Sequence, residues 1–246
     1  MGGKTRADMA LLERGLAHSR AQAQALILAG QVYWGEQRVE KAGAQVPEDA
    51  ELVVREGERY VSRGGKKLEG ALRQLGVDPT GWVVVDIGAS TGGFTDCVLQ
   101  HGARRVYAVD VGHGQLASRL REDGRVVVMD RTNARHLDAG SFPEPVDLAV
   151  VDASFISIDK LTDALSKIVP PGGRLLALVK PQFEAGRAEA SRSRGVIRDP
   201  HVRTAAIARA RAAIVAAGFA IVGERDSVVP GPKGNVECFV LAERSR

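Results

Sequence analysis

The chain has 246 residues and a formal net charge of +4, and hydrophobic residues make up 44% of it. This length is enough for one large domain, or for a large domain together with a small one. The mild basic excess is compatible with a polyanionic partner but does not require one. The two cysteines, Cys97 and Cys238, exclude a disulfide framework and predict a reducing, cytoplasmic environment.

The hydropathy pattern argues against secretion and membrane insertion. The first twenty residues contain no long apolar run, so we expect no signal peptide. The most apolar long stretch, 205–222, is interrupted by Arg209 and Arg211, so we expect no membrane span.

Residues 1–56 are predicted to form a small α+β module. The first apolar residues have helical spacing, and Ser19 is placed to cap a second helix over 20–29. The segment 32–34 and the turn after it predict a hairpin, which further short strands follow.

The string GLAHSRAQAQALILAGQVYWGEQRVEKAGAQV (15–46) resembles the small RNA-binding domain first described in ribosomal small-subunit protein four. In that domain a helix and a strand turn present basic residues to folded RNA. The residues that would do so here are Arg6, Arg14, Arg20 and Lys41. Charge alone does not identify them, because each arginine could equally belong to a solvated helix face.

A basic, glycine-containing segment, residues 57–67, is predicted to link this module to a second domain over 68–246. Gly64 and Gly65 interrupt the periodicity, so we expect a hinge there. The basic residues of the segment are Arg59, Arg63, Lys66 and Lys67.

From residue 83 onward, predicted strands and helices alternate, which indicates an α/β domain with a mostly parallel sheet. The last two strands, 219–225 and 236–241, are joined by a hairpin-type turn and should add one antiparallel strand. Ligands of an open parallel sheet bind beyond the carboxyl ends of its strands. Five predicted strands end there on ionisable residues: Asp86, Asp110, Asp130, Asp152 and Lys180.

The stretch VVVDIGASTGGFTD (83–96) predicts a strand, a glycine-rich turn and a helix. Such a turn lets backbone approach a ligand beside a helix N-terminus. The spacing differs from the dinucleotide-binding motif, and D-x-G-x-x-x-G-G resembles the first motif of S-adenosylmethionine (SAM) methyltransferases. An ordinary tight turn between strand and helix is the alternative. The expected fold is therefore a Rossmann-like SAM methyltransferase sheet.

Three of the four acidic strand ends have an expected role in holding SAM. Asp110 is placed to bind the ribose hydroxyls, and Asp86 to orient the glycine turn and the methionine ammonium. Asp130 could bind the adenine amino group or instead cap the turn at Thr132. The other candidate cofactor contacts are Gly88, Ser90, Gly92, Gly93 and Phe94.

The residues around the fourth strand end indicate which atom receives the methyl group. VVDASF (150–155) lacks the N/D-P-P-Y/F string with which N-methyltransferases hold a planar amine. A hydroxyl acceptor must lose its proton as its oxygen attacks the methyl, and a neutral lysine fixed by carboxylates is a natural base. Lys180 ends a buried strand and fits that role, although it could instead pair with Asp152 for a purely structural reason.

The segments YVSRGGKKL, DIGASTGGFTDCVLQHGA, VDASFIS, LVKPQFEAGR, RGVIRDP and KGNVECFV together resemble the TlyA family over nearly the whole chain. That family joins the small RNA-binding domain to an FtsJ-like ribose 2′-O-methyltransferase acting on ribosomal RNA, and its members are often labelled hemolysins. The resemblance implies SAM as cofactor and ribosomal RNA or ribosomal subunits as partner, and it implies no obligate protein partner. We expect no membrane partner, because the sequence has no secretion signal and no amphipathic or spanning segment. The Lys-Asp-Lys-Glu tetrad of the family falls on Lys67, Asp152, Lys180 and Glu237, and Lys66 leaves a slip of one residue open.

A basic loop at 186–198 is a candidate RNA-facing lip, or else a solvated loop without that role. Together with the linker it supplies three further candidate RNA contacts: Arg63, Arg187 and Arg194. We expect no metal site, because the histidines are scattered and the cysteines lie far apart. Two other functions stay open, an RNA-binding assembly protein without methyl transfer and a membrane-active hemolysin.

Overall fold

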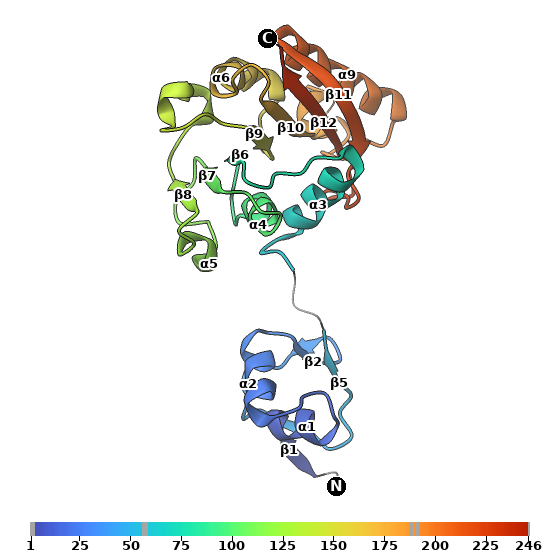
Figure 1. The fold of residues 1–246 in the computed structure, drawn as a ribbon. Coiled ribbons are helices and arrows are strands. Elements are labelled where there is room, and N and C mark those ends of the chain that lie inside the picture. The colour runs from blue at the N-terminus through green and yellow to red at the C-terminus, as the bar shows by residue number, and fades with distance from the viewer. Residues whose placement is uncertain (1–2, 56–58, 187–188, 190–191, 246) are drawn as a thin grey trace. The chain divides into compact units, whose positions relative to one another are not determined.

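A computed structural model describes residues 3–55, 59–186, 189 and 192–245. The chain divides into two compact units, Met1–Arg59 and Tyr60–Arg246 (Figure 1). Each unit has its own hydrophobic core, so each is described by itself.

The first unit is a small α+β fold. Ser19 caps the second helix as predicted, because its hydroxyl oxygen accepts a hydrogen bond from the Gln22 backbone N–H at 3.1 Å. One two-stranded and one three-stranded antiparallel sheet pack with the helices around a core of alanine, leucine, isoleucine and valine. The elements are β1 (Lys4–Arg6), α1 (Ala7–Glu13), α2 (Arg20–Leu28), β2 (Val32–Trp34), β3 (Gln37–Arg38), β4 (Gln45–Pro47) and β5 (Leu52–Val54).

The second unit alternates strands with helices. Its elements are α3 (Arg63–Leu75), β6 (Val83–Ile87), α4 (Gly93–Gln100), β7 (Arg105–Val109), α5 (Ser118–Arg121), β8 (Val126–Met129), β9 (Leu148–Val151), α6 (Thr162–Ile168), β10 (Arg174–Val179), α7 (Pro181–Glu184), α9 (Pro200–Ala216), β11 (Phe219–Asp226) and β12 (Cys238–Arg244), with short 3₁₀ turns η1 (Ala134–His136), η2 (Ala139–Ser141) and η3 (Ile158–Lys160).

The seven-stranded sheet has the order β11-β12-β10-β9-β6-β7-β8. Strands β10, β9, β6, β7 and β8 are parallel, whereas β12 runs antiparallel to both of its neighbours. The predicted α/β fold, with a mostly parallel sheet and one antiparallel strand, is confirmed.

Helices cover both faces of this sheet (Figure 1). Successive side chains of a strand point to opposite faces, so Val83 and Val85 of β6 pack with α6 and α9, while Val84 packs with α3 and α4. Because both faces are buried, β6 is a continuous apolar run up to Asp86 rather than an alternating pattern. In β6 the acidic residue accordingly stands near the carboxyl end of the strand.

Helix α3 begins at Arg63, earlier than the predicted start of the second domain at residue 68. Ser62 caps it, and the Val61 backbone N–H donates to the Asp96 carboxylate of α4 at 2.8 Å. The predicted hinge at Gly64 and Gly65 is wrong, because both lie in the first turn of α3. A Cβ on Gly65 would lie 2.2 Å from the buried Tyr60 ring, so this glycine permits close packing.

Candidate functional site

A cavity of about 820 Å³ lies at the carboxyl edge of the sheet in the second unit. Its lining includes all four predicted catalytic residues, Lys67, Asp152, Lys180 and Glu237. A second cavity of about 500 Å³ adjoins it and is lined in part by Asp110. The residues common to both linings are Gly88, Ser90, Asp152, Ser154 and Phe155.

The glycine-rich turn brings backbone close to both cavities. Gly88 has φ +86°, and a Cβ there would lie 2.8 Å from the Asp152 carbonyl oxygen, so only glycine fits. Gly93 opens α4, and a Cβ on it would meet the Ser62 hydroxyl at 2.2 Å. The first turns of α3 and α4 therefore lie in contact, which brings α3 to the edge of the cavity.

Asp86 is completely buried behind this turn. One carboxylate oxygen accepts hydrogen bonds from the Thr95 backbone N–H at 2.9 Å and from the Thr95 hydroxyl at 2.7 Å. The other oxygen is buried and has no hydrogen-bond partner among the described residues. Burial raises the pKa of Asp86 to about 7, although the Thr95 hydrogen bonds act in the opposite direction.

Asp110 holds the backbone that lines the second cavity. Its two carboxylate oxygens accept from the Ser90 N–H at 2.8 Å and from the Gly112 N–H at 2.7 Å. Ser90 is held with φ +49°, in the left-handed region, and lines both cavities. Two observations fit a cationic, ribose-bearing cofactor here. The Asp110 carboxylate lies on the wall of the second cavity, where a ribose hydroxyl can reach it. The unpartnered buried oxygen of Asp86 lines neither cavity and can act on a cationic group only through its charge.

Asp130 has a different environment from the other strand-end acids. Its carboxylate pairs with Arg121 at 2.7 Å and with His113 Nδ1 at 3.0 Å, and accepts from the Gly114 N–H at 2.9 Å. These contacts lower its pKa, the Gly114 hydrogen bond most. Asp130 is absent from both cavity linings, and its side chain does not cap the turn at Thr132, which bonds to its carbonyl instead.

Lys67 and Glu237 form a buried ion pair at the cavity wall. Lys67 Nζ lies 2.6 Å from Glu237 Oε2, and only 8% and 1% of the two side chains are exposed. Lys66 is exposed and lines a groove on another side of α3. Of the two lysines that the sequence leaves open, Lys67 therefore lies at the cavity and Lys66 does not.

Lys180 and Asp152 form the second pair, from adjacent strand ends. Lys180 Nζ lies 2.5 Å from Asp152 Oδ1, as an ion pair rather than a well-aligned hydrogen bond. The same nitrogen donates to the Ser154 hydroxyl at 2.9 Å and more weakly to the Asp152 carbonyl at 3.4 Å. The four tetrad positions thus come together as two lysine–carboxylate pairs around one cavity.

Phe155 stands at the junction of the two cavities and was not predicted. Its side chain is 91% exposed and its backbone has φ +65°, a strained value for a non-glycine residue. The ring lies 5.3 Å from that of Phe183, which also lines the larger cavity. Phe94, a predicted cofactor contact, is buried against Phe239 and contributes to the same lining.

Asn235 is a second residue that sequence reasoning missed. Its buried carboxamide accepts from the Ile197 N–H and donates to the Gly195 carbonyl, both at 2.8 Å. It therefore fastens the segment 195–197 to the turn that precedes Glu237. The only sequence signal is its place in KGNVECFV, beside a predicted tetrad residue.

The four predicted RNA contacts of the first unit differ in the hydrogen bonds and ion pairs that they make within the unit. Arg6 and Arg20 both contact the buried carboxylate of Asp8 and lower its pKa, the Arg6 hydrogen bond most. Arg14 donates to the carbonyls of Glu48, at 2.8 Å, and Ala50, which is a structural role. Lys41 is exposed.

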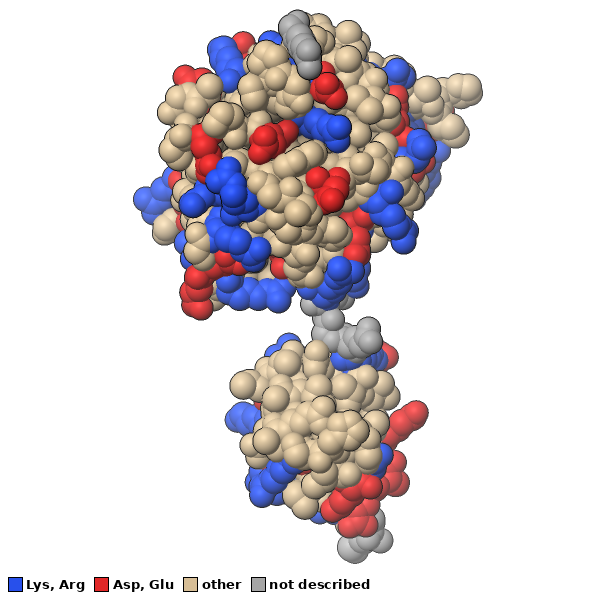
Figure 2. Space-filling model, viewed as in Figure 1, with Lys and Arg blue, Asp and Glu red and all other residues tan. Residues whose placement is uncertain are grey.

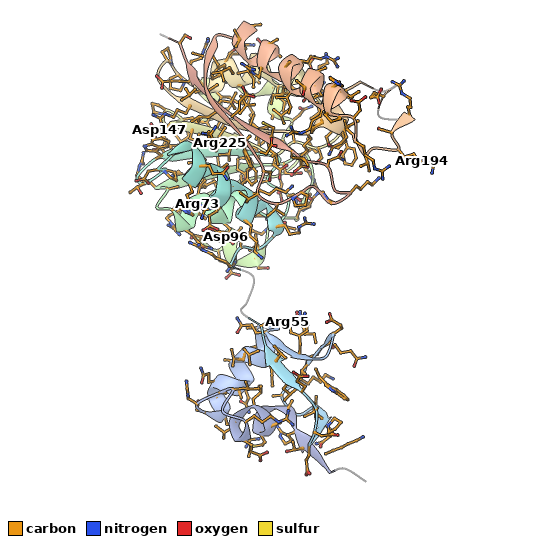
Figure 3. All side chains as sticks on the ribbon, turned by 90° about the vertical axis from the view of Figure 1, so that its right-hand side faces the viewer. Arg55, Arg73, Asp96, Asp147, Arg194 and Arg225 are labelled. Carbon is orange, nitrogen blue, oxygen red and sulfur yellow. The ribbon has the colours of Figure 1, made fainter. Side chains whose placement is uncertain are left out.

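The predicted RNA contacts of the second unit lie in different places, one at the larger cavity and one at the outer edge of the unit. Arg63 lines the larger cavity and donates to the Pro230 carbonyl at 2.7 Å. Figure 3 shows Arg194 at the outer edge of the unit, and Arg187 lies outside the described residues. On the face seen in Figure 2, Lys and Arg side chains alternate with Asp and Glu rather than forming one continuous basic patch.

Two further findings concern metal binding and membrane insertion. The described residues hold no group of three or more His, Cys, Asp or Glu side chains that could bind a metal ion. Among the helices described, none has both the length and the apolar character that crossing a bilayer would need.

Comparison with known proteins identifies both units. The S4 domain matches residues 5–52 and the FtsJ-like methyltransferase matches residues 60–244. The 16S/23S rRNA (cytidine-2′-O)-methyltransferase TlyA of Mycobacterium tuberculosis is 44% identical over 242 residues, covering 98% of this chain and 90% of the relative. Hemolysin A of Brachyspira hyodysenteriae is 40% identical over 233 residues, covering 94% and 97%. The solved structure of a "putative hemolysin" from Streptococcus thermophilus has a TM-score of 0.75 and 39% identity, and covers 100% of this chain and 90% of that one.

Proposed function

Because the chain belongs to the TlyA family, FtsJ-like methyltransferases with an N-terminal S4 domain, we propose that it methylates the 2′-hydroxyl of a cytidine in ribosomal RNA. The observation that carries this proposal is the pair of lysine–carboxylate contacts around one cavity. A hydroxyl acceptor needs a base, and Lys180, which lines the larger cavity beside Asp152, would provide one.

SAM, when bound, supplies an electrophilic methyl group on a sulfonium sulfur. Asp110 would hold the ribose hydroxyls in the second cavity, and the free oxygen of Asp86 would balance the positive charge of the methionine portion. Gly88 would allow the close approach of backbone. The contacts of Asp130 with Arg121 and Gly114 favour a structural role for it, so we withdraw it from the proposed cofactor contacts.

Lys180 would accept the proton of the 2′-hydroxyl. It can do so only when neutral, and Asp152 then keeps its amine in place and stabilises the ammonium that forms. Lys67 would present a second positive charge to the developing oxyanion, and Glu237 would fix its position. Positioning of both reactants is the main contribution of the protein, as in other group transfers.

Phe155 would hold the base of the target nucleotide. An aromatic residue that is 91% exposed, with a strained backbone, at the junction of two cavities suggests a functional use. Stacking of a base on an aromatic side chain contributes about 1–3 kcal/mol. Such a ring suits a nucleotide that has left its stack, because enzymes that act inside a duplex or fold must first expose their target.

The first unit would supply RNA affinity. Its match to the S4 domain supports this role, and Arg6, Arg20 and Lys41 are the contacts we propose, without Arg14. In the second unit we propose Arg63 and Arg194, and Arg187 remains a proposal that rests on sequence alone.

The test is a map of 2′-O-methyl groups in ribosomal RNA from cells with and without this protein. We expect at least one cytidine 2′-O-methyl group to disappear when the gene is deleted, and to return with the wild-type gene but not with Lys180→Ala. Identical maps would favour an RNA-binding protein without methyl transfer. Leakage from liposomes treated with purified protein would instead favour the hemolysin alternative.

A further inference from the structure

Ser154 contacts the proposed base Lys180 and lines the same cavity. Among the described residues, three oxygen atoms surround Lys180 Nζ: Asp152 Oδ1 at 2.5 Å, Ser154 Oγ at 2.9 Å and the Asp152 carbonyl at 3.4 Å. Only 9% of the Lys180 side chain and 23% of the Asp152 side chain are exposed, whereas Ser154 is an exposed residue. A substrate hydroxyl entering the cavity therefore meets Ser154 more readily than the lysine.

The backbone holds this serine firmly. The Asp152 N–H bonds to the Ile87 carbonyl at 3.0 Å, and the Ile158 N–H bonds to the buried Glu184 carboxylate at 2.8 Å. Ser154 thus lies on a segment anchored on both sides. It also lines both cavities, where the substrate hydroxyl and the methyl donor would meet.

The Lys180 amine and the Ser154 hydroxyl have the hydrogen-bonding groups that a proton relay needs. An ammonium has three hydrogens and can fill all three oxygen positions, but a neutral amine has two hydrogens and one lone pair. The Ser154 hydroxyl can then turn and donate to that lone pair, and its oxygen keeps lone pairs that can accept a hydrogen bond from the cavity.

We propose that Ser154 is a catalytic residue that carries the proton from the substrate 2′-hydroxyl to Lys180; this inference rests on the proposed function. As the 2′-oxygen bonds to the methyl carbon, the carbon–sulfur bond of SAM breaks and its electron pair stays on sulfur. The 2′-hydroxyl proton passes to Ser154 Oγ while the proton of Ser154 passes to neutral Lys180 Nζ. The products are a 2′-O-methyl ether, a neutral thioether, an unchanged serine and a lysine ammonium.

The test compares Ser154→Ala with Ser157→Ala in the full chain. Ser157 is a matched control, because it lies on the same segment and its hydroxyl bonds to Asp159, and it lines neither cavity. General acid–base groups typically contribute about 10²–10⁴-fold. We expect single-turnover methyl transfer to fall at least tenfold in Ser154→Ala and to stay near wild type in Ser157→Ala.

Two further measurements separate a relay from a serine that only positions the lysine. In mixtures of H₂O and D₂O, the wild-type rate should follow a curve that bows downward, since two protons move together, and the Ser154→Ala rate should fall on a straight line. Nitrogen-15 NMR of lysine side chains in the cofactor-free protein gives a readout that needs no activity. The Lys180 signal, assigned with Lys180→Arg, should shift in Ser154→Ala and not in Ser157→Ala.

Any one of three results would overturn the relay: a loss below tenfold in Ser154→Ala, a straight line for wild type, or an unmoved Lys180 signal. A wild-type protein that transfers no methyl to ribosomal RNA would overturn the proposed function as well. An active wild type with a normal Ser154→Ala rate would overturn the relay alone.

Discussion

The ion pair of Lys67 with Glu237 is the most deeply buried charged contact at the cavity, with 8% and 1% of the two side chains exposed. Removing one partner of such a pair leaves an uncompensated buried charge, at a cost of about 3–5 kcal/mol. Lys67→Met should therefore lower the free energy of unfolding by about that amount and abolish methyl transfer. Chemical denaturation and a transfer assay measure the two effects.

Lys66→Met is the matched control, because Lys66 is exposed and outside the cavity. We expect it to retain stability and activity. The double variant Lys67→Met, Glu237→Gln should recover most of the stability, since no unpaired charge remains, yet stay inactive. An active Lys67→Met protein would reduce the proposed tetrad to a triad.

Asp86 gives the unfolding free energy a specific pH dependence. Burial raises its pKa from 3.8 to about 7 in the folded state, so between those values the folded chain holds a proton that the unfolded chain has released. The contribution of Asp86 to stability is therefore full below pH 3.8, falls as pH rises toward 7, and is constant above it. The slope is at most about 1.4 kcal/mol per pH unit.

Asp86→Asn keeps the shape of the side chain and lacks this titration. Its unfolding free energy relative to wild type should improve steadily from pH 4 to pH 7 and level off beyond. Urea denaturation of both proteins at several pH values measures the difference. Parallel curves for the two proteins would show that Asp86 ionises normally in the folded state.

At the scale of elements, Asn235 links two segments that lie far apart in the chain. Its carboxamide is the hydrogen-bond partner of the Ile197 N–H, which is buried. Replacing Asn235 with Ala should leave that N–H unpaired, at a cost of about 1–3 kcal/mol, and release the segment 195–197. Hydrogen exchange at Ile197 should accelerate at least tenfold while exchange in β10 (Arg174–Val179) is unchanged. Equal exchange rates at Ile197 would show that the segment is held by other contacts.

The sequence predicts the strands of this fold better than it predicts where the helices begin. Strand β10 (Arg174–Val179) ends directly before Lys180, as predicted, because a continuous apolar run stops there at a charged residue. Helix α3 (Arg63–Leu75) begins before residue 68, the predicted start of the second domain. Its first turn contains Gly64 and Gly65, whose low helix propensity hides this start in the sequence. Packing against Tyr60 and Gly93 outweighs that propensity, and such contacts between distant segments are not visible in local sequence.

The sequence likewise predicts some residues of the candidate site and not others. Strand-end position brings Asp110, Asp152 and Lys180 to one edge, as expected from the rule for open parallel sheets. Asp130 also ends a strand, but its carboxylate pairs with Arg121 and accepts from the Gly114 backbone N–H, and it lines neither cavity. Strand-end position determines which edge of the sheet a side chain occupies, whereas its partner depends on loop geometry that the sequence pattern does not encode.

For the whole molecule, separate cores in the two units predict separable tasks. A fragment of residues 59–246 keeps Tyr60 and the complete helix α3 (Arg63–Leu75), so it should fold and bind SAM with unchanged affinity. Its affinity for ribosomal RNA should fall at least tenfold, and its binding should depend less on salt because fewer phosphate contacts remain. Calorimetry with SAM and filter binding with RNA measure these quantities. Equal RNA affinity of fragment and full chain would remove the RNA-binding role from the first unit.

The most direct test of the central claim follows the methyl group itself. Purified protein is incubated with SAM carrying a labelled methyl and unmodified ribosomal RNA, and the RNA is digested to nucleosides. We expect label in 2′-O-methylcytidine with wild type and with the exposed-lysine control Lys160→Ala, and none with Lys180→Ala, whose SAM affinity stays within about twofold of wild type. Label on a base, or full transfer by Lys180→Ala, would contradict the account.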